Sequence, residues 1–297
     1  MATTDKDLVK QMNFLVPTGK RVWLFVLITV LCMVLGSVIM SLFMSKGVTP
    51  RSLRIATILQ DIMMFILPAV ATAVMITRTP ARFIMIDRKP KTALVMLVIA
   101  TILAAVPAMN LIVSWNQQLT LPESMKEIES ILRDSEAHAA ELTSLIFGNW
   151  STASYIVALL IVSVLAGVSE ELYFRGGLQR ILVTAPIGKH LAIWGTAIIF
   201  SAVHMQFFGF VPRMLLGAYF GYLCVWTECL WLPIIAHVLN NAMAATALWM
   251  SHNHGYDMMD KVGTTEGEWV YAAVSAVLTV YLLFLTYRTS QKQALKK

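Results

Sequence analysis

Two adjacent carboxylates, Glu170 and Glu171, lie inside a long hydrophobic stretch, with Arg175 four residues further on. An ionisable side chain is costly in such surroundings, so it is expected to have a function and a partner. On a helix, Glu171 and Arg175 share one face in the favourable order for an ion pair. Glu170 points elsewhere and is predicted to stay free to accept a proton. The alternative is an ion-pair cluster with a purely structural role.

His204 is predicted to lie at the same depth as Glu170. Pro186 and Gly188 indicate a turn between two apolar stretches, and the two polar residues lie equally far along the chain before and after it. On antiparallel helices both would stand about 25 Å from that turn. The spacing therefore brings an imidazole to the level of the free carboxylate.

A second imidazole, His237, is followed four residues later by Asn241, so both side chains share one face of a helix. Taken alone, a histidine in an apolar helix is most often a packing residue. Its convergence with the acid and with His204 favours a functional role instead.

Two kinds of chemistry fit these groups. In the first, Glu170 with the help of His204 takes a proton from water as the water attacks a carbonyl group. His237 and Asn241 then donate hydrogen bonds to the developing oxyanion. In the second, Glu170, His204 and His237 hold a zinc ion with water at its open position. Because no HExxH sequence is present and the three residues lie on separate stretches, the sequence permits zinc but does not require it.

The composition is that of a membrane protein. Of the 297 residues, 58% are hydrophobic and 13% charged, and the mean hydropathy is +0.70. A soluble domain has about 25% charged residues. The net charge of +6 lies mainly between apolar stretches, where it sets orientation, so it does not indicate a nucleic-acid partner. The three cysteines lie in apolar stretches without ligand spacing and predict no disulfide framework.

Eight stretches are long and apolar enough to span a bilayer, which needs about 20 residues. They are residues 22–44, 55–77, 92–114, 150–172, 191–208, 211–230, 232–250 and 269–287. We therefore predict an all-α polytopic membrane protein, a single domain over residues 1–297, built as a bundle of about eight transmembrane helices around a membrane-embedded polar site. Asp61, a further intramembrane acid, is interpreted as hydrogen-bonded to a neighbouring helix or as lying near the surface; the alternative is a place along a cavity or proton path.

Charges between the stretches predict the orientation. Residues 78–91 carry five basic side chains and one acid, whereas 115–149 carry six acids and two bases. The positive-inside rule then places both termini in the cytoplasm. Lys46, Arg51 and Arg54 in the first external loop oppose this assignment. The polar start of the chain, with no cleavage site after the first span, indicates an uncleaved anchor.

An amphipathic helix is predicted over residues 120–148, on the external surface. Apolar residues recur there at helical spacing between Met125 and Ile146, with acidic and basic residues on the other face. Pro122 suits a first helical turn.

The polar sites resemble the signature of the CAAX-protease and bacteriocin-processing (CPBP or Abi) family of intramembrane endopeptidases. The family patterns EExxxR, FxxxH and HxxxN correspond here to residues 170–175, 200–204 and 237–241. The resemblance covers residues 150–250, which would form the catalytic core. It implies an eight-helix fold whose cavity opens to the cytoplasmic side and to lipid.

The resemblance also implies a role for each residue. Glu170 would be the catalytic base, and His204 would help it to position water. His237 and Asn241 would form the oxyanion hole. The remaining pair, Glu171 and Arg175, would support the site. Although the family is often described as metal-dependent, the two donors on one helix face suit an oxyanion better than a metal, so we expect no cofactor.

The predicted function is an endopeptidase in a bacterial cell membrane. It would cut membrane-associated proteins or peptides near the cytoplasmic face, in contact with the lipid bilayer and without nucleic acid. A non-catalytic immunity or scaffold protein with the same fold is one alternative. A transporter is another, although the sequence has no inverted repeat of the kind that many transporters show.

Overall fold

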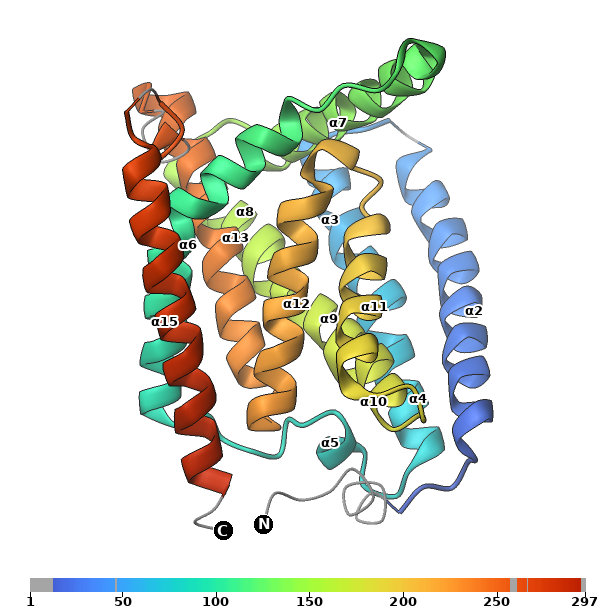
Figure 1. The fold of residues 1–297 in the computed structure, drawn as a ribbon. Helices are drawn as coiled ribbons and strands as arrows, with labels where there is room; N and C mark the ends of the chain where they lie inside the picture. The colour runs from blue at the N-terminus through green and yellow to red at the C-terminus, as the bar shows by residue number, and fades with distance from the viewer. Residues whose placement is uncertain (1–12, 46, 257–260, 266, 295–297) are drawn as a thin grey trace.

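The chain forms a bundle of helices that stand side by side (Figure 1). This computed structural model describes residues 13–45, 47–256, 261–265 and 267–294. Within these ranges, seven helical segments are long and apolar enough to cross a membrane. Five of them are α2 (Thr18–Met44), α6 (Thr92–Gln117), η5 (Phe207–Gly209) with α12 (Phe210–Thr227), α13 (Trp231–His254) and α15 (Trp269–Ala294).

The other two segments are built from several pieces each. One consists of α3 (Pro50–Gln60), η1 (Asp61–Ile66) and α4 (Leu67–Ile76). The other consists of α8 (Thr152–Leu159), η3 (Leu160–Leu165), α9 (Ala166–Glu171), η4 (Leu172–Gln179) and α10 (Arg180–Val183). The prediction of an all-α polytopic membrane protein is confirmed.

Apolar side chains cover the outside of the bundle. On α2, Trp23 and Leu42 are 75% and 70% exposed, and on α15 Val277 is 72% exposed. An apolar surface of this kind would be unfavourable in water but is expected in contact with lipid. Inside the bundle, one buried cluster joins α2, α4, α10, α12 and α13 to the short helix α5 (Pro80–Phe83).

The fifth predicted stretch, 191–208, is a shorter helix than expected. Helix α11 (Lys189–Ala202) has 14 residues, begins after Gly188 and packs along α12. At 1.5 Å per residue it is about 21 Å long, less than the hydrocarbon core of a bilayer. The chain turns after Ala202, and Met205 has the left-handed φ of 54°. His204 therefore lies in a turn and not within a helix.

Helix α7 (Lys126–Phe147), preceded by the short turn η2 (Glu123–Met125), crosses the end of the bundle at which α2 ends (Figure 1). Its C-terminal part packs against α3 and α8 through the buried Ile146 and Phe147. Its N-terminal part leaves Met125 and Ile128 exposed. The helix occupies the range predicted to be amphipathic, and its place outside the cell stays a prediction.

Two of the spanning segments contain π-helical turns next to the acidic residues. Segment η1 begins at Asp61, and η3 and η4 flank the six-residue α9 that ends in Glu170 and Glu171. π-Helical turns are rare and occur frequently at functional sites. Each widens the helix locally, so it changes which residues the following turn directs into the bundle.

Helix α9 approaches α13 closely because Gly167 has no side chain. A Cβ atom at this position would lie 2.8 Å from Cγ2 and 3.1 Å from the backbone nitrogen of Val238. The hydroxyl of Ser163 donates a hydrogen bond to the Val238 carbonyl at 2.7 Å. Both contacts fix the two helices that carry Glu171 and His237.

We expect Gly167→Ala to destabilise the protein by about 1–3 kcal/mol, because the added methyl group must displace the backbone of α13. Unfolding in mixed detergent micelles would measure this loss. Gly195→Ala on α11 is the matched control, since a Cβ there meets no atom within 4 Å. It should be neutral or stabilising by up to about 1 kcal/mol. Equal stabilities of the two variants would contradict close α9–α13 packing.

Candidate active site

The predicted ion pair between Glu171 and Arg175 lies at the centre of the bundle. Both side chains are fully buried, and the Arg175 guanidinium donates a hydrogen bond to Oε1 of Glu171. Nη2 of Arg175 also donates to the carbonyl oxygen of Gly217 on α12, at 2.8 Å. Removing two charges from water is costly, so such a pair is stable only when its geometry and further hydrogen bonds compensate.

Two aromatic rings enclose this ion pair. The Cζ atom of Arg175 lies 4.6 Å from the ring centroid of Phe200 and 5.3 Å from that of Phe220. A guanidinium close to an aromatic ring is stabilised by the charge distribution of that ring. Phe220 was not among the predicted site residues. The GxxxG spacing of Gly217 and Gly221, which is typical of closely packed membrane helices, is the signal that could have placed α12 here.

His237 joins the ion pair to the second acid. Its Nδ1 lies 2.9 Å from Oε1 of Glu171, and its Nε2 lies 3.8 Å from Oε2 of Glu170. The ring is buried and stacks on Phe220 with centroids 5.1 Å apart. Because an ionised carboxylate can only accept hydrogen bonds, Nδ1 carries the hydrogen towards Glu171. Glu171 thereby orients the ring so that Nε2 faces Glu170.

Glu170 makes fewer hydrogen bonds and ion pairs within the protein than Glu171. Its side chain is 13% exposed, and its buried Oε2 has no hydrogen-bond partner among the described residues. A buried polar atom without a partner is uncommon and calls for a functional explanation. Asp61 on η1, which packs against α9, is also buried. The free oxygen of Glu170 is therefore available to a water molecule or a substrate.

The aromatic ring of Phe200 lies between His204 and the cluster and contacts both. Its Nδ1 lies 2.8 Å from the carbonyl oxygen of Phe200, and its ring meets the Phe200 ring edge-on at 5.2 Å. The same Phe200 ring contacts His237 at 5.8 Å. If Nδ1 donates to the carbonyl, Nε2 of His204 remains an acceptor. No hydrogen bond or ion pair joins His204 to Glu170 within the described part of the chain, so its role towards water stays a prediction.

Asn241 lies one turn beyond His237 on α13, as predicted. Its amide nitrogen donates to the carbonyl oxygen of Val162 on η3 at 3.2 Å, and its oxygen accepts from Asn240 at 3.3 Å. One amide hydrogen is thus held by η3, and the second remains for another acceptor. Its role in an oxyanion hole stays a prediction.

Glu170, His204 and His237 are not grouped in this structure as the three ligands of a zinc ion, and the zinc alternative stays a prediction. Zinc binds nitrogen and oxygen ligands at about 2.0–2.2 Å. Nδ1 of each histidine has a partner within the protein, so Nε2 is the atom of each ring that could bind a metal. Across the ranges that the structure describes, no three His, Cys, Asp or Glu side chains are grouped so that they could hold a metal ion.

Comparison with known proteins identifies the segment that contains all these residues. Residues 149–243 match the family model described as type II CAAX prenyl endopeptidase Rce1-like. The resemblance to the CPBP family is confirmed. The CPBP-like segment covers Glu170 through Asn241 and therefore all three sequence patterns.

A curated relative covers part of the same chain. The uncharacterized protein YpbD of Bacillus subtilis (strain 168) is 26% identical over 98 residues. This alignment spans 32% of the chain and 47% of the length of YpbD. No solved structure matches the chain.

We expect Arg175→Met to destabilise the protein by about 3–5 kcal/mol, because Glu171 would keep a buried charge without its partner. Adding Glu171→Gln to this variant should restore much of the lost stability. Both variants lose the bond to the Gly217 carbonyl, so their difference isolates the unpaired charge. Unfolding in mixed detergent micelles provides the measurement. A double variant no more stable than Arg175→Met would contradict the pairing.

Proposed function

We propose that this protein is an intramembrane endopeptidase that hydrolyses peptide bonds in membrane-associated proteins or peptides. One observation carries the proposal. A buried cluster of two carboxylates, an imidazole and a guanidinium lies within a segment that matches the CAAX prenyl endopeptidase family. In this cluster Oε1 of Glu171 accepts hydrogen bonds from Arg175 and His237, whereas Glu170 is partly exposed and forms no ion pair with Arg175; Oε2 of each acid has no hydrogen-bond partner among the described residues. That asymmetry is what a general base requires.

The proposed reaction begins with water bound at Glu170. The carboxylate takes a proton as the water oxygen forms a bond to the peptide carbonyl carbon. The carbonyl oxygen becomes an oxyanion that accepts hydrogen bonds from Asn241 and from Nε2 of His237, whose ring must carry a hydrogen on both nitrogens in this step. When the C–N bond breaks, Glu170 returns its proton to the leaving amine. The products are a carboxylic acid and an amine, and the enzyme is restored.

The other residues position these groups. Glu171 holds Nδ1 of His237, and Arg175 neutralises Glu171. His204, fixed by the Phe200 carbonyl, would direct its other nitrogen to the attacking water. All the groups in this mechanism are side chains of the protein itself.

The charge pattern supports an orientation for this reaction. Helix α2 begins and α15 ends at the same end of the bundle, where the segment around α5 carries Arg78, Arg82 and Arg88 (Figure 1). We assign this end to the cytoplasm of a bacterial cell. His237 lies within the second turn of α13 from this end, whereas His204 lies in the turn before η5, which contacts α7 at the other end, so the proposed site lies inside the bundle between the two ends.

We expect Glu170→Gln to abolish cleavage, with a loss of about 10²- to 10⁴-fold or more, because the amide cannot accept the proton. His204→Ala should also lose activity while inserting normally in the membrane. Comparative proteomics of membrane fractions from cells with the original or the Glu170→Gln protein would identify the substrate that accumulates uncut. Purified protein and that substrate would then give the rates.

Glu141→Gln is the control, since it makes the same change at an exposed position on α7. It should cleave at the original rate. If Glu170→Gln retained full activity in cells and in the purified assay, the proposed mechanism would be wrong and a non-catalytic role would be favoured.

A further inference from the structure

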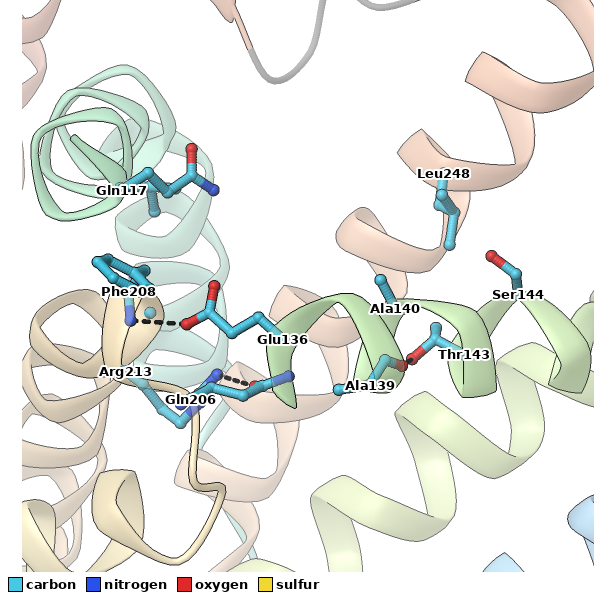
Figure 2. A pocket seen from close by; sticks show the side chains of 12 residues that line it. Gln117, Glu136, Ala139, Ala140, Thr143, Ser144, Gln206, Phe208, Arg213 and Leu248 are labelled. Carbon is cyan, nitrogen blue, oxygen red and sulfur yellow. Dashed lines mark hydrogen bonds between the residues drawn. The ribbon is translucent and has the colours of Figure 1, made fainter. Parts of the chain in front are cut away.

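A cavity of about 320 Å³ lies beneath α7 (Figure 2). Its walls come from the end of α6, from α7, from the turn between α11 and α12, and from α13. Its polar lining includes Gln117, Glu136, Gln206 and Arg213, and its apolar lining includes Phe208 and Leu248. Pockets for small ligands have volumes of about 300–1,000 Å³. This cavity is therefore large enough for one or two residues of a peptide.

Arg213 is the positive group of this cavity, and its hydrogen bonding is incomplete. Nη2 donates to Oε1 of Gln206 at 2.5 Å, whereas Nη1 is buried and has no hydrogen-bond partner within the described residues. The nearby Glu136 carboxylate accepts from the backbone nitrogen of Phe208 at 2.6 Å, so the two side chains make separate contacts (Figure 2). A buried charged donor without a partner is unfavourable. The site therefore favours an anionic acceptor.

Arg213 also links the cavity to the candidate active site. Its hydrogen-bond partner Gln206 lies two residues beyond His204 in the turn that follows α11. Arg213 comes from the first turn of α12, whereas the three sequence patterns lie on other parts of the chain. A ligand bound at its guanidinium would therefore lie beside the turn that carries His204.

We propose that this cavity is a subsite for a carboxylate of the peptide substrate, bound by Arg213 together with Gln206. The carboxylate belongs either to an acidic side chain or to a C-terminus. Guanidinium groups bind carboxylates through paired, charge-assisted hydrogen bonds. The inference rests on the proposed endopeptidase function. It implies that the part of the peptide with the negative charge is directed towards α7.

Matched pairs of quenched fluorescent peptides with a lipid chain, presented in detergent micelles, would test the subsite. One set of pairs exchanges Glu for Gln at successive positions, and another exchanges a C-terminal acid for an amide. We expect the acid member of one set to have a kcat/KM about 10- to 100-fold higher, mainly through KM. Arg213→Gln should reduce this ratio to about 1. Arg288→Gln, at an exposed position on α15, should keep it.

Binding provides a readout that does not depend on cleavage. Fluorescence anisotropy would compare the same peptides on Glu170→Gln and on Glu170→Gln/Arg213→Gln. Tighter binding of the acid member, lost with Arg213→Gln, would support the subsite even if no peptide were cut, although the endopeptidase proposal would then fail. Cleavage or binding without a charge preference would overturn the subsite alone, as would absence of all binding. If Arg213→Gln reduced the cleavage rate of acid and amide peptides equally, Arg213 would act through Glu170 and not on the carboxylate of the substrate.

Discussion

The structure depends on keeping a charged carboxylate inside an apolar bundle. Burying an ion in a low-dielectric interior costs several kcal/mol, and that cost must be offset by its neighbours. Glu171 meets this condition through Arg175 and through Nδ1 of His237. The same three groups connect η4 to α13. The stabilisation of the buried charge and the packing of these helices therefore depend on each other. A helix shift that separated Glu171 from Arg175 and His237 would leave the cost of burying its charge without compensation.

Small residues on α12 complete this constraint. Arg175 donates to the carbonyl of Gly217, and one turn further on Gln179 donates to the carbonyl of Gly221 at 3.0 Å. Donors and acceptors thus repeat with a spacing of four residues along two helices. A Cβ at Gly221 would lie 2.5 Å from Oε1 of Gln179 and 2.9 Å from Cγ2 of Ile193, so a larger residue would displace these side chains. These two hydrogen bonds hold η4 against α12, and the rings of Phe200 and Phe220 lie against the guanidinium.

The sequence was sufficient to predict those features that depend on local spacing. The Glu171–Arg175 pair follows from a separation of four residues, and the spans follow from hydropathy. The early end of α11 could not be predicted, because residues 203–208 remain largely apolar although they form a turn. The contact between His237 and Glu171 also escaped prediction. It depends on how closely α9 and α13 approach, which is set by Gly167 and Val238 far apart in the chain.

The two adjacent acids show why neither alone would suffice. Glu171 accepts from Arg175 and His237, so its charge is stabilised and it is unavailable for proton transfer. Its effect is to fix the His237 ring, whose Nε2 then faces Glu170 at 3.8 Å. Glu170 has no cation of its own at hydrogen-bonding distance in the described ranges, and Oε2 stays open. Adjacent positions on a helix diverge by about 100°, which allows one acid to face the structural ion pair and the other to face the space next to it. The two acids thus divide support from reactivity, because a single carboxylate could not both hold Arg175 and His237 and remain free to accept a proton.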